Sequence, residues 1–193
     1  MDMQSFVREE EVMKMNAELA WKRDFTLEDI EKLPEGVRAE LIDGQIFYFA
    51  APTTVHQRLV MKISNILYNH IKDAHGECEV LSAPIAVKLA EDGKNYLEPD
   101  IIVVCDDEKM KPDGCHGAPD LVIEIVSPST RKRDYGLKVL QYRTAGVKEY
   151  WIVDPMKQMV MVYWFENEEE NCLYGMQDEI EFHMFPGLKV RLE

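Results

Sequence analysis

The sequence predicts a mixed α/β (α+β) domain in which helices flank a central sheet. Apolar residues recur at helical spacing over 54–74, and a second helix is expected to begin at Ser129 or Thr130 and to end at Gly146. β-branched and aromatic residues dominate the segments expected to form strands, which are 79–89, 96–104, 120–126, 148–153 and 158–165. This order of helices and strands is typical of helices packed against a sheet.

Two local signals place the beginning of the domain. Thr26, with Asp29 three positions later, predicts the capped start of a short helix. Asp43-Gly44 separates the apolar segments 38–42 and 45–49 and therefore predicts a β-hairpin.

We expect the chain to divide into an N-terminal helical extension, residues 1–25, and one domain, residues 26–193. A chain of 193 residues is long enough for one domain to bury a proper core, and no internal repeat or low-complexity linker interrupts it. The N-terminus has no apolar segment typical of a signal peptide, and no segment has the roughly 20 apolar residues of a membrane span. We therefore expect a cytoplasmic protein with no membrane partner.

The four cysteines are widely scattered and include no C-x-x-C pair. This spacing favours reduced cysteines over a disulfide framework. Cys105, Cys115 and His116 form the alternative, a set of three zinc ligands, but their spacing matches no common zinc motif.

The formal net charge of −14 opposes a role in nucleic-acid binding, because phosphates are neutralised mainly by lysine and arginine. Much of the acid lies in expected loops and ends, whereas basic residues gather after Glu124. This basic cluster consists of Arg131, Lys132, Arg133, Lys138 and Arg143. A local basic face on an acidic body is therefore compatible with the sequence.

Two carboxylates occupy apolar segments where hydrocarbon side chains are expected. Asp100 opens one expected strand, and Glu124 lies in the middle of a later one. If the two strands pair, both carboxylates can share a hard cation, with Glu40 as a third oxygen ligand or a supporting contact. Mg²⁺ or Mn²⁺ suits such oxygen ligands better than zinc does.

The helix after Glu124 supplies a lysine. Asp134, Lys138 and either Gln141 or Tyr142 form a polar stripe that could point at the metal site. Gly136 costs this helix about 1 kcal/mol relative to alanine, which indicates either a close backbone approach or a tolerated defect.

Each of these residues also has a simpler interpretation, which for Glu40 with Arg38 and for Lys138 with Asp134 is a solvated ion pair. Asp100 and Asp120 both follow proline and are equally consistent with strand-entry residues; Asp120 is the second choice for the strand carboxylate. Glu124 could face water on an edge strand. His56, in the first turn of the long helix, is either a structural histidine or one that reaches a phosphate.

Several motifs together resemble one known family, the Uma-type restriction endonucleases of the PD-(D/E)xK superfamily. The resemblance runs from about Thr26 to Gly187. The motifs are Glu-Leu-Ile-Asp-Gly at 40–44, His56, Pro99-Asp100, the block 119–130, Arg133-Asp134, Lys138 and the block 145–155. It implies the restriction-endonuclease-like fold, with Asp100 and Glu124 as metal carboxylates and Glu40 as the upstream acid.

The chain departs from the superfamily pattern at Val126, where a lysine is usual. The resemblance therefore implies that the lysine has moved to the following helix, with Lys138 as the candidate. The implied activity is hydrolysis of phosphodiester bonds in nucleic acid, most simply DNA, with Mg²⁺ or Mn²⁺ as cofactor. The alternative is an inactive module of the same fold that serves as a DNA- or protein-binding scaffold.

A homodimer is expected, because cutting both strands of a duplex needs two sites. The segment 159–165 presents Met159, Met161, Tyr163 and Phe165 on one side. This side is either a dimer surface or the core face of an edge strand.

Overall fold

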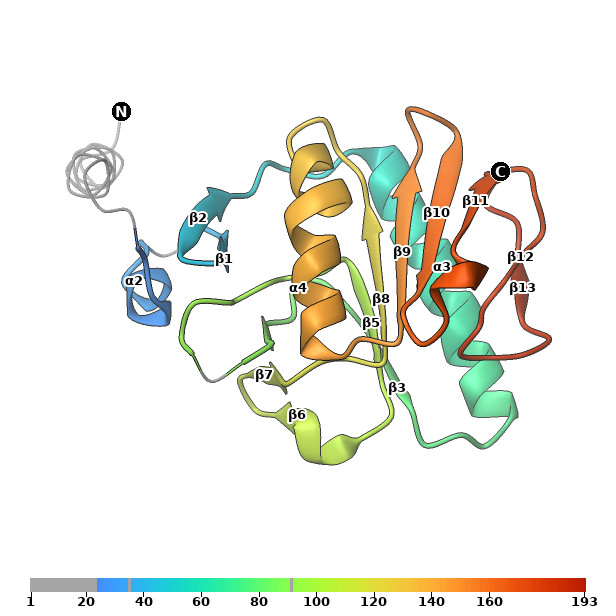
Figure 1. Cartoon of the computed structure of the whole chain (residues 1–193), viewed down its shortest axis with the longest axis horizontal. Helices are drawn as coiled ribbons and strands as arrows, with labels where there is room; N and C mark the ends of the chain where they lie inside the picture. Colours follow the sequence, from blue (N-terminus) through green and yellow to red (C-terminus); the bar gives the residue numbers. More distant parts are fainter. Residues whose placement is uncertain (1–23, 35, 91) are drawn as a thin grey trace.

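The computed structural model describes residues 24–193, except for residues 35 and 91. The expected N-terminal helical extension therefore lies outside the described residues, apart from residues 24 and 25. A six-stranded sheet forms the centre of the fold, in the order β11-β10-β9-β8-β5-β3 (Figure 1). These strands are β3 (Glu79–Ser82), β5 (Ile101–Val104), β8 (Leu121–Ile125), β9 (Glu149–Asp154), β10 (Met159–Trp164) and β11 (Cys172–Gly175).

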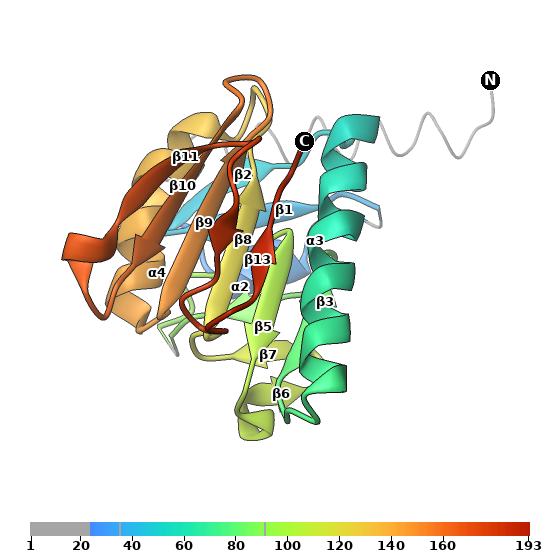
Figure 2. The ribbon, with the colours of Figure 1, turned by 90° about the vertical axis from the view of Figure 1, so that its right-hand side faces the viewer.

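Helices cover both faces of this sheet, as expected (Figure 2). The helix α3 (Thr54–Asp73) packs Leu59, Ile63 and Leu67 against one face, and the tail strands β12 (Ile180–Glu181) and β13 (Lys189–Val190) complete this half of the core. The helix α4 (Lys138–Ala145) covers the opposite face. Successive residues of a strand point to opposite faces, so each central strand contributes to both halves of the core.

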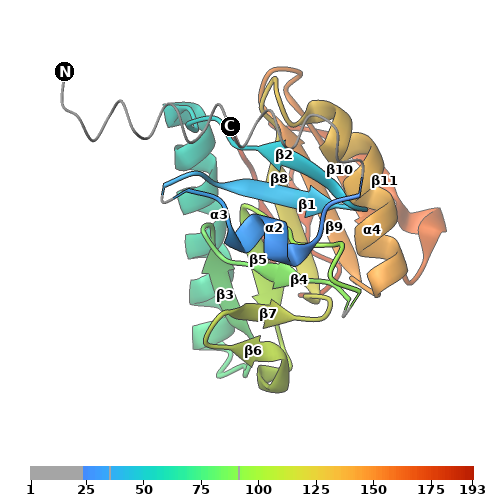
Figure 3. The same cartoon turned by 90° about the vertical axis from the view of Figure 1, so that its left-hand side faces the viewer.

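Smaller elements lie on the α4 face of the sheet (Figure 3). The helix α2 (Leu27–Glu31) has the expected capping box between Thr26 and Asp29. It precedes the hairpin of β1 (Ala39–Ile42) and β2 (Gln45–Tyr48), which turns at Asp43-Gly44 as predicted. A three-stranded sheet contains β4 (Val87–Lys88), β7 (Gly114–His116) and β6 (Met110–Lys111), and short 3-10 helices follow β5 and β10 at Asp107–Lys109 and Glu168–Glu170.

The predicted strands 79–89 and 96–104 are shorter than expected. The first is interrupted around Pro84 and divides into β3 and β4, which belong to different sheets. Proline cannot donate a backbone hydrogen bond to a sheet, which accounts for the interruption. The second pairs with the main sheet only from Ile101 onward, while Tyr96 and Leu97 form isolated bridges.

The second helix is also less regular than predicted. The π-helix Arg133–Leu137 precedes α4, and the side-chain hydrogen bonds at its entry join Ser127 to Thr130. Gly146 ends α4 in a left-handed conformation, with φ 95°, as expected for a C-cap. A Cβ atom added at Gly136 would meet nothing within 4 Å, so this glycine is a tolerated defect and not a close backbone approach.

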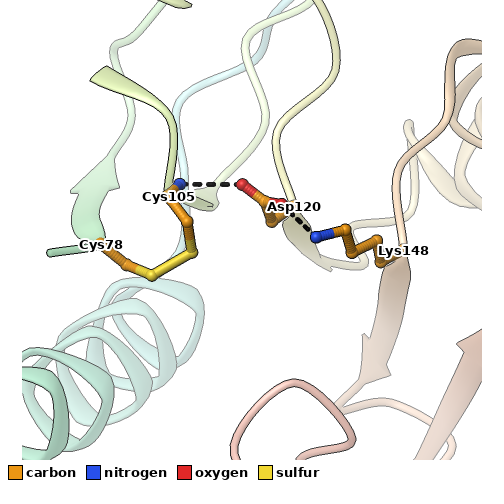
Figure 4. The surroundings of a disulfide bond; sticks show 4 residues. All are labelled: Cys78, Cys105, Asp120 and Lys148. Atoms are coloured by element: carbon orange, nitrogen blue, oxygen red, sulfur yellow. Dashed lines mark hydrogen bonds and ion pairs between the residues drawn. A yellow bond between two sulfur atoms is a disulfide. The ribbon is translucent and has the colours of Figure 1, made fainter. Parts of the chain in front are cut away.

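The expectation of reduced cysteines is wrong for one pair. Glu79 of β3 lies opposite Val104 of β5, so the next residues along each strand, Cys78 and Cys105, are also neighbours. They form a disulfide (Figure 4). The alternative zinc set is thereby excluded, because the sulfur of Cys105 is already bonded.

Met161, Tyr163 and Phe165 pack against the α4 half of the core. The strand β10 also lies between β9 and β11 and is not an edge. The core interpretation is therefore confirmed for these three residues, but the expectation of an edge strand is wrong. Among the described residues, no helix has the length and apolar character needed to cross a membrane.

Candidate active site

The pairing of β5 with β8 brings the two predicted carboxylates together. The strands are antiparallel with Ile101 opposite Ile123, so Asp100 comes to lie beside Glu124. The backbone N–H of Ile125 donates a hydrogen bond of 2.7 Å to Oδ2 of Asp100. Glu124 lies inside the sheet and is 5% exposed, so the edge-strand interpretation of this residue is wrong.

Lys138, the first residue of α4, reaches the same place from above the sheet. Its Nζ atom lies 2.8 Å from Oε1 of Glu124 and 2.7 Å from Oε1 of Glu40, and the residue is 1% exposed. Asp134 is a third carboxylate neighbour, with Oδ1 at 3.6 Å. Three buried carboxylates therefore surround one buried ammonium group.

The π-helix explains how two cations reach Glu40. The N–H of Lys138 bonds to the carbonyl of Arg133, five residues earlier, so these two residues lie on the same side of the helix. Arg133 Nε is 3.8 Å from Oε2 of Glu40, and Lys138 contacts Oε1. In an ordinary α-helix, residues five apart point in different directions. Glu40 also accepts a 3.3 Å hydrogen bond from the backbone N–H of Glu98.

The predicted polar stripe of the helix continues through Tyr142 and not through Gln141. The Tyr142 hydroxyl donates a 2.9 Å hydrogen bond to Oε1 of Glu124, the oxygen that Lys138 also contacts. Gln141 is half-buried and has no hydrogen bond to any described residue.

Burial and the excess of carboxylates around Lys138 shift the pKa values of the side chains in this cluster. Burial raises the pKa of Glu124, and the charges of Asp134, Asp100 and Glu40 raise it further, against the opposing effect of Lys138. Burial also raises the pKa of Asp134. Burial disfavours the charged form of Lys138, but Glu124, Glu40 and Asp134 outweigh it and raise the pKa of the ammonium group. Lys138 therefore stays protonated at neutral pH.

His56 contacts Asp100 from the first turn of α3. Its Nε2 atom lies 3.1 Å from Oδ2 of Asp100. Burial lowers the pKa of His56, but the hydrogen bond and the charge of Asp100 more than compensate, so the pKa is raised above 6.5. The histidine is thus a half-buried side chain beside one of the candidate metal carboxylates.

Asp120, the second choice for the strand carboxylate, lies at the other end of β8 (Figure 4). Its Oδ2 accepts a 2.8 Å hydrogen bond from the N–H of Cys105, and its Oδ1 lies 2.9 Å from Nζ of Lys148. These contacts make Asp120 part of the structure around the disulfide and not part of the candidate site.

A pocket of about 740 Å³ opens beside the carboxylates and is lined by Asp100, Glu124, Lys138 and His56. Glu98 and Arg38 also line it and are paired, with Arg38 Nε 2.9 Å from Oε2 of Glu98. This pair was not anticipated from the sequence. The signal available there was Glu98 itself, a carboxylate two residues before Asp100 in an apolar segment.

A family model described as "Putative restriction endonuclease", Uma2, matches residues 27–193 of this chain. The chain belongs to the Uma2 family. Two uncharacterized Synechocystis proteins are similar to it: slr1290, 27% identical over 74% of this chain and 75% of that protein, and sll1609, 28% identical over 75% and 84%.

The fold of this Uma2 chain is also found in a solved structure. The crystal structure of "a putative nuclease belonging to DUF820" from Anabaena variabilis superposes with a TM-score of 0.71. The superposition covers 87% of this chain and 95% of that chain at 21% identity. The expected nuclease-like fold, with a central mixed sheet flanked by helices, is therefore confirmed.

The carboxylates of this Uma2 chain fit a hard divalent cation. Asp100 Oδ1 and Glu124 Oε2 have no hydrogen bond or ion pair with any described residue, and both residues line the pocket. Carboxylate oxygens are preferred ligands of Mg²⁺ and Mn²⁺. Within the described part of the chain, no three His, Cys, Asp or Glu side chains form a metal site by themselves. A cation held here therefore needs further ligands from water or substrate.

Proposed function

We propose that this Uma2 protein is a metal-dependent endonuclease that hydrolyses phosphodiester bonds in nucleic acid, most simply in DNA. The observation that supports this best is the convergence of Asp100 and Glu124 on neighbouring strands, with Lys138 Nζ at 2.8 Å from Glu124. Membership of a family described as "Putative restriction endonuclease" supports the same activity.

In this proposal Asp100 and Glu124 hold Mg²⁺ or Mn²⁺ at the pocket. A divalent cation bound there supplies electrostatic stabilisation for the charge that develops on a phosphate oxygen. Lys138 is held in place by Glu40, so its ammonium group is oriented before substrate arrives. Its charge would stabilise the negatively charged transition state.

His56 contributes through Asp100. Its contact with Oδ2 orients the carboxylate and leaves Oδ1 directed to a ligand. Glu40 positions Lys138 and does not itself line the pocket.

The alternative function is an inactive scaffold of the same fold. Val126 in the usual lysine position and the net charge of −14 support it. The placement of Lys138 beside Glu124 favours the enzyme, because a helix lysine then supplies the charge that Val126 does not.

The direct test is cleavage of plasmid and single-stranded DNA at low salt with Mg²⁺ or Mn²⁺. We expect cleavage by the wild type and none by Glu124→Gln or Asp100→Asn, with weaker Mn²⁺ binding by calorimetry in both variants. The matched control is Glu77→Gln, which changes an exposed glutamate outside the pocket and should leave cleavage unchanged. Full cleavage by Glu124→Gln would contradict the proposal, and a wild type that neither cleaves nor binds metal would favour the scaffold.

The expected homodimer is the part of this proposal that applies to a duplex substrate, since two sites are needed to cut both strands of a duplex. Sedimentation velocity over a range of concentrations would measure it. A monomer at all concentrations would restrict the proposal to cutting one strand at a time.

A further inference from the structure

The walls of the candidate active-site pocket are mainly apolar. Five regions of the chain contribute apolar residues there: the segment after β2, the first turn of α3, the segment after β3, the end of β8 and the end of β9. The apolar residues that they contribute include Phe49, Pro52, Val55, Pro84, Val126 and Met156. Val55 is 52% exposed and Met156 51% exposed, so both apolar side chains are open to a ligand that enters the pocket.

Cations are scarce in the same walls. Among the described residues that line the pocket, the lysines and arginines are Arg38 and Lys138. Arg38 is paired with Glu98, and Lys138 is enclosed by Glu40 and Glu124. Both cations are therefore already paired with carboxylates, and neither adds unpaired positive charge to the pocket. Three carboxylates, Glu98, Asp100 and Glu124, line the pocket as well.

This combination is poorly suited to double-stranded DNA. Duplex binding depends on lysine and arginine side chains that neutralise many phosphates. The bases of a duplex are also enclosed in the stack, and one of them must be unpaired and unstacked at a cost in free energy before it can fill an apolar hollow.

A single strand offers the chemistry that the pocket can bind. Unpaired bases have apolar planar faces, which stack on aromatic and apolar side chains. Phe49 is such a side chain, and one of its faces is covered by the Arg38 guanidinium group at 5.1 Å from the ring centroid. A base held against these walls would bring its own phosphate to Asp100 and Glu124, since the same pocket contains both groups.

We propose that the substrate is single-stranded nucleic acid, with one unpaired base bound in the apolar part of the pocket beside the carboxylates. This inference rests on the proposed nuclease function for its choice of ligand. It specifies that the substrate is single-stranded and names the side chains that select it. Phe49 and Met156 are the selecting residues that can be tested most directly.

Binding is measured by fluorescence anisotropy with labelled DNA of about 12 nucleotides, within the usual site size of single-strand binding proteins. The single strand is compared with its duplex in the presence of Ca²⁺, which takes the same carboxylate ligands. We expect the single strand to bind at least about tenfold more tightly than the duplex. Phe49→Ala should weaken single-strand binding about tenfold, as expected for the loss of one stacking partner.

Met156→Ala is the second variant, because an exposed residue in a turn can be changed without affecting folding. It should weaken single-strand binding about threefold. The matched control is Leu140→Ala on α4, which is 61% exposed and outside the pocket, and it should bind like the wild type. Thermal unfolding of each variant verifies that the fold is retained.

The outcomes separate this inference from the nuclease proposal. Equal affinity for duplex and single strand, or wild-type binding by both pocket variants, would overturn the inference even if the protein cleaves DNA. Tight, Phe49-dependent binding of the single strand without any cleavage in Mn²⁺ would support the inference and overturn the nuclease proposal. No binding of either DNA form would overturn the inference.

Discussion

Nζ of Lys138 lies 2.8 Å from Oε1 of Glu124, although one residue begins a helix and the other lies within a strand. The contact connects α4 to the central sheet through two buried charges. Since Glu40 and Asp134 also face the ammonium group, removing the lysine would leave three buried carboxylates without their common cation.

Lys138→Met should therefore destabilise the protein by about 3–5 kcal/mol, the usual cost of leaving a buried ion pair without one partner. The free energy of unfolding in urea measures it. Lys189→Met is the matched control, because Lys189 pairs with Glu179 at 3.2 Å but is 46% exposed. The control should lose at most about 1 kcal/mol. Similar losses of stability in both variants would show that the buried ion pairs of Lys138 contribute no more than the exposed pair of Lys189.

The contact between His56 and Asp100 should make stability depend on pH. Asp100 raises the pKa of folded His56 above its ordinary value of 6.5. A raised pKa means that protonated His56 stabilises the fold, fully below about pH 6.5 and progressively less as the pH rises through the higher folded value. The stability difference between the wild type and His56→Gln should shrink over that interval. Urea unfolding at a series of pH values measures it, and a difference that grows with pH would refute the assignment.

The disulfide between Cys78 and Cys105 should be detectable by counting thiols. Denatured, unreduced protein should react with Ellman's reagent at Cys115 and Cys172 only. Reduction, or Cys78→Ser, should lower the free energy of unfolding by about 3–4 kcal/mol, because the bond closes a loop of 27 residues in the unfolded chain. Cys172→Ser is the control and should leave stability nearly unchanged. Four reactive thiols would disprove the bond.

Two glycines near α4 should respond in opposite directions to alanine. Gly136→Ala should stabilise the protein by about 0.5–1 kcal/mol, because an added Cβ meets open space and alanine loses less chain entropy on folding. Gly146→Ala should destabilise it by about 1 kcal/mol, because φ at this C-cap is +95°. Thermal unfolding measures both changes. The same sign in the two variants would contradict this account of the helix.

The sequence was informative wherever one residue type imposes a local geometry or a periodic pattern. Asp43-Gly44 predicted the hairpin, and the helical spacing of Leu59, Ile63 and Leu67 predicted α3. The proximity of Asp100 and Glu124 followed from the expectation that their strands pair, which the register of β5 and β8 bears out.

The remaining features depend on three-dimensional register, which residue spacing does not reveal. Cys78 and Cys105 are neighbours only because Glu79 pairs with Val104. The Arg38 pair with Glu98 likewise joins the hairpin to a segment 60 residues later. The π-helix has no distinctive residue pattern. The sequence therefore could not predict that Arg133 and Lys138 both contact Glu40.

The π-helix also has an evolutionary consequence. It aligns Arg133 with Lys138 by means of a single extra residue in the turn between them. Deleting that residue would rotate Arg133 away from Glu40, and a second insertion would do the same to Lys138. In homologous chains the segment between Glu124 and Lys138 should therefore vary in sequence far more readily than in length.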